Sequence, residues 1–112
     1  MAVSNETYKI LFQAVNTVNT LLYTSPAGGL GTVVSFISWA NTGTANDTVY
    51  IEVVPSGGTS GQTKQILVPT AMIAANTASS YGSGLTLNAG DMIYGYTGTV
   101  NTNIQAYGAE LS

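Results

Sequence analysis

Thr48-Val49-Tyr50-Ile51-Glu52-Val53-Val54 is the stretch that decides the fold class of this 112-residue chain. Its β-branched and aromatic residues favour a strand, and apolar side chains recur at every second position. This period of two is typical of a strand with one face buried. We expect an inward face of Val49, Ile51 and Val53, and an outward face of Thr48, Tyr50 and Glu52.

Similar short segments lie on both sides of this stretch. Glycine and proline separate them about every ten residues, which is typical of a sandwich or barrel built from short strands. Lysine, arginine and glutamate, the usual helix formers of protein surfaces, are nearly missing. We therefore predict an all-β fold, an antiparallel β-sandwich of jelly-roll-like type in one domain (1–112) with about eight short strands. The expected strands are 8–15, 21–24, 32–40, 48–54, 65–68, 85–87, 91–96 and 103–111.

The alternation also predicts which side chains share a face in two of these strands. In the first strand we expect Ile10 and Phe12 on one face. In the strand 32–40 we expect one face with Val34 and Phe36, and another with Val33, Ile37 and Trp39. Residues 72–80 fit either a strand or a single helical turn, and we favour extended structure.

The turn residues follow from backbone chemistry. Pro26 and Gly28 set the turn after the second strand, since proline fixes φ and glycine accepts unusual φ values. The glycines around Gly28 lack the lysine and following helix that a phosphate-binding loop needs, so we interpret this loop as a turn. Gly90 is expected to take a positive φ, and the Asp91 side chain is expected to cap backbone amides of the same turn.

The composition excludes several classes of chemistry. The chain has no cysteine and no histidine, so serine–histidine and cysteine–histidine nucleophiles and the usual zinc sites are not available. We predict that the protein is not an enzyme and has no cofactor or metal. Two lysines without arginine do not suit nucleic-acid binding. Charged residues make up 6% of the chain, against about 25% in typical domains.

Four acidic residues are candidates for a site. Asp91 with Glu52 or Glu110 could form a carboxylate pair for acid–base catalysis, but the acids are scattered and have no basic partner. Asp47 could supply oxygen ligands to calcium, although no regular ligand spacing surrounds it. We therefore expect Asp47 to be a solvated turn residue.

The aromatic residues offer a surface for binding. Trp39 lies within an apolar strand, where burial in the core is favoured over a role in stacking on sugars. Tyr94 and Tyr96 share one face of a strand at period two and suit an interface or a ligand, and Tyr107 is a third candidate.

Four segments together resemble small virion proteins of tailed bacteriophages. They read LYTSPAG (22–28), VVPSGG (53–58), LTLNAGDMI (85–93) and GAEL (108–111), in the same order as in that group. The resemblance implies a jelly-roll sandwich, often trimeric, that serves as a capsid decoration (cement) protein or as a tail or fibre component. It brings no catalytic residues.

The expected function is therefore that of a capsid decoration protein that reinforces the head lattice. The partners would be the major capsid protein or other virion proteins, with a homotrimer as the oligomer. The N-terminal segment lacks the pattern of a secretory signal, and no apolar run is long enough for a bilayer, so we expect a virion protein made in a host cytoplasm, with no membrane partner. The alternative is a tail or fibre component that binds host-surface carbohydrate.

Overall fold

The structure is a computed structural model that describes residues 5–82 and 84–112. The first four residues of the N-terminal segment considered above for an export signal lie outside this range. Nine strands and one short 3₁₀ helix occur in the described residues. They are β1 Glu6–Ala14, β2 Thr20–Thr24, β3 Gly31–Asn41, β4 Asp47–Val54, η1 Thr63–Gln65, β5 Ile66–Ile73, β6 Thr77–Tyr81, β7 Leu85–Leu87, β8 Met92–Thr97 and β9 Thr102–Leu111.

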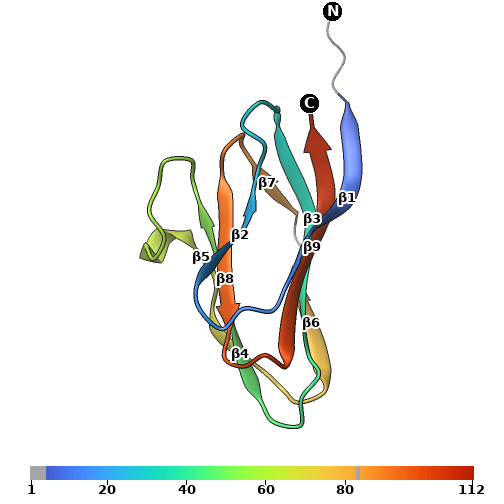
Figure 1. Cartoon of the computed structure of the whole chain (residues 1–112), viewed down its shortest axis with the longest axis vertical. Helices are drawn as coiled ribbons and strands as arrows, with labels where there is room; N and C mark the ends of the chain where they lie inside the picture. The colour runs from blue at the N-terminus through green and yellow to red at the C-terminus, as the bar shows by residue number, and fades with distance from the viewer. Residues whose placement is uncertain (1–4, 83) are drawn as a thin grey trace, which may run out of the picture.

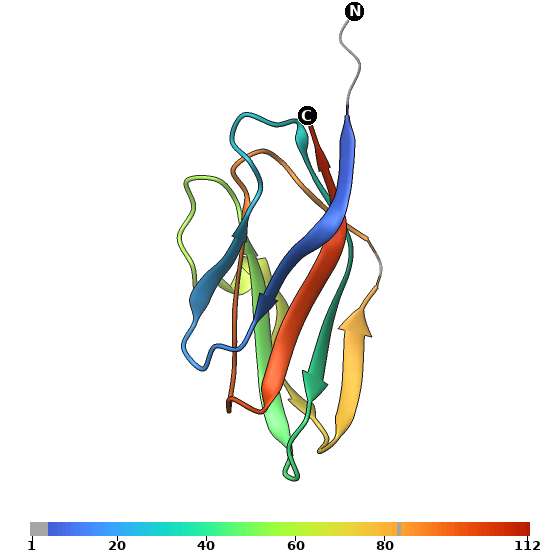
Figure 2. The same cartoon turned by 45° about the vertical axis from the view of Figure 1, so that its right-hand side comes forward.

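The strands form two antiparallel sheets that face each other (Figures 1 and 2). The first has the order β1-β9-β3-β6, with β7 also paired to β3, and the second has the order β2-β8-β4-β5. The chain changes sheet after β1, β2, β3, β5, β7 and β8, which is the winding of a jelly roll. The predicted all-β sandwich is confirmed.

The core lies between the two sheets. Trp39 is buried there, as expected, because the inner faces of both sheets carry large apolar side chains. The core also includes Val34, Ile37, Val49, Ile51, Leu87, Ile93 and Ile104, each at most 2% exposed. The region 72–80 is extended, as predicted, apart from a turn in which Asn76 has a φ of 54°.

Two β-bulges in the first sheet contradict the predicted faces of β1 and β3. In β1, the register against β9 shifts between Ile10 and Phe12, so Ile10 is 52% exposed while Phe12 packs in the core. A bulge inserts one residue and therefore reverses the faces of all residues beyond it.

The second bulge lies in β3, between Val34 and Phe36. It places Val34 with Ile37 and Trp39 on the core side, and it leaves Val33 and Phe36 on the outer side, 39% and 40% exposed. The prediction that Val34 and Phe36 share a face is wrong for this reason.

In β4 the inward positions of Val49 and Ile51 are confirmed, but Val53 is only half-buried. Glu52 was expected in solvent and is fully buried. The reason is a contact from another segment, since the loop after β4 folds back over this side chain.

Candidate functional site

The Glu52 carboxylate is the centre of a buried hydrogen-bond network. It accepts bonds from Tyr50 Oη at 2.8 Å, from the backbone N–H of Gly61 at 2.9 and 3.1 Å, from Ser60 Oγ, and from Asn19 Nδ2 at 3.5 Å. Burial raises the pKa of Glu52, but these bonds outweigh burial and hold the pKa below its ordinary value. The network fixes the loop after β4 to the outer side of the second sheet.

Asp47 forms a second network, at the start of β4. It is 6% exposed, and the prediction of a solvated turn residue is therefore wrong. Its carboxylate accepts bonds from Thr48 N at 2.8 Å, from Thr99 Oγ1 and N at 2.7 and 3.2 Å, and from Thr102 Oγ1 at 2.6 Å. These donors join β4 to the β8–β9 turn and use the oxygen lone pairs that a calcium ion would need.

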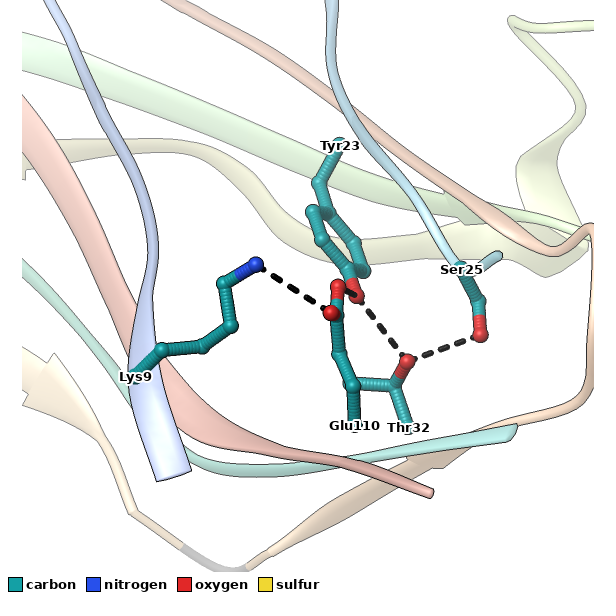
Figure 3. A network of polar contacts seen from close by, with 5 residues as sticks. All are labelled: Lys9, Tyr23, Ser25, Thr32 and Glu110. Atoms are coloured by element: carbon teal, nitrogen blue, oxygen red, sulfur yellow. Dashed lines mark hydrogen bonds and ion pairs between the residues drawn. The ribbon is translucent and has the colours of Figure 1, made fainter. Parts of the chain in front are cut away.

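Glu110 belongs to a third network, shown in Figure 3. It accepts a bond from Tyr23 Oη at 2.5 Å and pairs with Lys9 Nζ at 3.1 Å. Tyr23 also contacts Thr32 Oγ1 at 3.0 Å, and Thr32 contacts Ser25 Oγ at 2.7 Å. The bond from Tyr23 lowers the pKa of Glu110, while burial and the Glu110 bond raise the pKa of Tyr23 to about 12.

The predicted turn residues lie in the connections between strands. Gly90 has a φ of 86°, and Asp91 accepts bonds from the backbone N–H groups of Asn88 and Ser56, both at 2.9 Å. Pro26 O accepts the bond that closes its turn, from Gly29 N at 3.1 Å. Gly28 has open space around it and no positive φ, so its position does not require glycine.

The acidic residues considered for catalysis thus belong to separate networks. Glu52, Glu110 and Asp91 each bond to their own set of neighbours. Within residues 5–82 and 84–112, no group of three or more acidic, histidine or cysteine side chains could hold a metal ion. In the same residues, no helix is long and apolar enough to cross a bilayer.

The three tyrosines singled out for binding lie on different sheets. Tyr94 and Tyr96 are on β8, and Tyr96 stacks on Tyr50 of β4 with ring centroids 5.0 Å apart. The side chains of Tyr94, Tyr96 and Tyr50 are half-buried. Tyr107 is on β9, on the outer face of the first sheet, and therefore belongs to a different surface.

An apolar patch covers the outer face of the first sheet around Tyr107. One row across β1, β9 and β3 contains Ile10, Tyr107 and Phe36, and the Tyr107 and Phe36 rings are 5.0 Å apart. The next row contains Tyr8, Ala109 and Val33. We call Tyr8, Ile10, Val33, Phe36 and Tyr107 the outer patch. Its exposed fractions are 74% for Tyr8, 52% for Ile10, 39% for Val33 and 40% for Phe36.

Polar side chains border the outer patch on one side. Gln13 Nε2 donates to Gln105 Oε1 at 2.9 Å, and the Tyr107 hydroxyl donates to the same oxygen. Gln105 Nε2 in turn donates to Asn103 Oδ1 at 3.1 Å. Only Tyr107 of the outer patch was predicted from the sequence, because the two bulges decide which apolar residues face outward.

A shallow depression lies where the two sheets meet, near the ends of β4 and β7. Val53, Leu67, Leu85 and Lys64 are among the residues that line it. Its walls are mostly apolar, and a single amine does not form a catalytic site.

The chain was compared with family models, curated proteins and solved structures, and none of them matches it.

Proposed function

We propose that this protein is a structural component of a bacteriophage virion, a capsid decoration protein that attaches to the head lattice through the outer patch. The observation that carries the proposal is the exposure of aromatic and aliphatic side chains in two adjacent rows of the first sheet. Exposed apolar patches on soluble domains typically mark sites of protein association. The jelly-roll winding agrees with the architecture that the sequence resemblance implies.

The energetics of the outer patch favour a protein partner. Removing apolar surface from water contributes about 25 cal/mol per Å², and aromatic anchors such as Tyr8 and Phe36 dominate interfaces of this kind. A charged residue, Glu6, contacts the edge of the patch by accepting a bond from Tyr8 Oη at 2.5 Å. The attachment would therefore depend on apolar burial rather than on charge.

The proposed partner is the major capsid protein or another virion protein, and the homotrimer stays a prediction. Tyr94 and Tyr96 face away from the first sheet, so a threefold contact through them would leave the outer patch available. Light scattering on the purified protein measures the oligomeric state.

Two double variants test the attachment. Ile10→Thr with Phe36→Thr removes the centre of the outer patch while keeping residues that suit strands. Val18→Thr with Val100→Thr is the matched control, since these valines are 72% and 71% exposed but lie outside the strands. Purified protein is added to particles that lack it, and the bound copies are counted and located by immunogold labelling.

We expect the outer-patch variant to lose at least ten-fold in affinity for heads, and the control to bind like the wild type. Equal binding by both variants, or label on tails alone, would overturn the proposal.

A second candidate is a tail or fibre component that binds carbohydrate. It rests on the position of Tyr107 and Phe36 beside the amides of Gln13 and Gln105, since aromatic faces with neighbouring amides suit sugar rings. A glycan array with the same two double variants distinguishes the functions. Sugar binding that the outer-patch variant abolishes would favour this second candidate.

A further inference from the structure

The two sheets have four edges, and three of them carry features that oppose pairing with another strand. The edge strand β1 has its bulge after Ile10, and β2 has a register shift between Leu21 and Tyr23. The edge strand β5 contains Pro69, and Thr70 beside it has a φ of 48°. Bulges and prolines are the devices by which proteins protect free edges.

The fourth edge lies beside β3 and is formed by β6 and, further along β3, by β7. Its β6 part lacks these features. Residues 77–81 pair with β3 in an unbroken register, from Tyr81 opposite Ile37 to Thr77 opposite Asn41. The strand contains no proline, no charge and no residue of positive φ, and four of its five side chains are exposed. Figures 1 and 2 both show its outer side uncovered.

We propose that β6 pairs with β6 of a second copy of this chain, antiparallel, about a twofold axis at Ser79. A twofold axis perpendicular to the sheet makes the two copies of β6 antiparallel. The core-facing sides of the two first sheets then lie on the same side of the joined sheet. Residues directly opposite each other in an antiparallel pair have their side chains on the same face. The axis must therefore pass midway between the two copies of one residue. An axis at Ser79 pairs all five residues, whereas an axis at Ala78 or Ser80 pairs three.

The side chains of β6 are compatible with this contact. The axis places Ser79 opposite Ser79, Ala78 opposite Ser80, and Thr77 opposite Tyr81. Small residues let the two backbones approach, and no like charges oppose each other. A backbone hydrogen bond makes only a modest net contribution, so five paired residues give a weak dimer that forms at high local concentration.

This inference does not depend on the proposed attachment. The strand β6 is an edge of the first sheet, whereas the outer patch covers β1, β9 and β3. A bound particle surface would raise the local concentration and favour the contact.

Single cysteines test the contact and its register, because the chain has no cysteine of its own. Ser79→Cys places two thiols opposite each other, within the range that a disulfide needs. Val18→Cys is the control, at a position 72% exposed outside the strands. Each variant is oxidised mildly and run on a non-reducing denaturing gel, which detects the pair whatever other oligomer forms.

We expect Ser79→Cys to form the disulfide dimer at least ten-fold faster than Val18→Cys. A mixture of Ala78→Cys and Ser80→Cys should give mainly the mixed dimer, because the register pairs these positions. Similar rates for Ser79→Cys and Val18→Cys would overturn the proposal, and random products from the mixture would overturn the register.

A charge on the edge gives a second measurement on a cysteine-free protein. Ala78→Lys should abolish the association measured by sedimentation between micromolar and millimolar concentration, because it places lysines beside the axis. Val18→Lys adds the same charge elsewhere and should associate like the wild type. Equal association of Ala78→Lys and Val18→Lys would contradict the twofold contact.

Discussion

Replacing Glu52 with glutamine tests whether the buried carboxylate network stabilises the fold. The change keeps the size of the side chain, but it removes the charge and turns one acceptor oxygen into a donor. If the amide nitrogen takes the Oε2 position, it faces Tyr50 Oη and Gly61 N; at Oε1 it faces Ser60, Gly61 and Asn19. The Tyr50 and Ser60 hydroxyls can turn to accept from the amide, whereas Gly61 N and Asn19 Nδ2 can only donate. One bond is therefore lost at Oε2 and up to two at Oε1.

The magnitude follows from this count. A hydrogen bond to a charged group contributes about 1.5–3 kcal/mol, and Glu52 is fully buried, so water does not replace the lost acceptor. We expect Glu52→Gln to lower the free energy of unfolding by about 3 kcal/mol and the melting temperature by about 10 °C. Glu6→Gln, which removes an exposed charge, is the control and should cost less than about 0.5 kcal/mol.

Urea and thermal unfolding measure both variants at neutral pH, with the fluorescence of the buried Trp39 as the signal. The pH dependence gives a second check. The folded protein holds the pKa of Glu52 below its ordinary value, so this stabilisation is present above the ordinary value and is lost as pH falls through the lowered pKa. The difference between wild type and Glu52→Gln should therefore shrink in acid. Equal stability of Glu52→Gln and Glu6→Gln at neutral pH would refute the reasoning.

Four further predictions concern other parts of the molecule. Gly90→Val should destabilise by roughly 1 kcal/mol or more in urea unfolding, because of its positive φ, whereas Gly28→Val should be nearly neutral. The free energy of unfolding, measured by circular dichroism, should fall as pH rises from about 10 through about 12, where Tyr23 loses its proton in the folded protein. In Tyr23→Phe it should fall less over the same range. EDTA should leave the melting temperature unchanged, since protein donors occupy the Asp47 oxygens; a large drop would reveal a bound cation. Protein bound to particles should resist washing up to about 1 M sodium chloride, where the Debye length is about 3 Å; progressive release would show an electrostatic contact.

Local sequence patterns predicted most of the fold. The β-branched segments and the glycines and prolines between them predicted the strand positions to within a few residues in most cases. The exceptions are β5, which extends to Ile73, and β6, which was expected only as extended structure within 72–80. The turn around Gly90 could also be predicted, because the positive φ and the capping by Asp91 depend on neighbours in the chain. Such features depend on the local sequence and not on the partner strands.

The surfaces and buried polar groups depended on tertiary structure. A bulge is a mismatch between two paired strands, so nothing in β1 or β3 alone indicates that Ile10 and Phe36 face outward. The burial of Glu52 and Asp47 likewise depends on donors from distant segments, Asn19 for the first and Thr102 for the second. The sequence by itself determined an all-β sandwich through local propensity and periodicity, whereas long-range pairing decided the outer patch, the acidic networks and the free edge at β6.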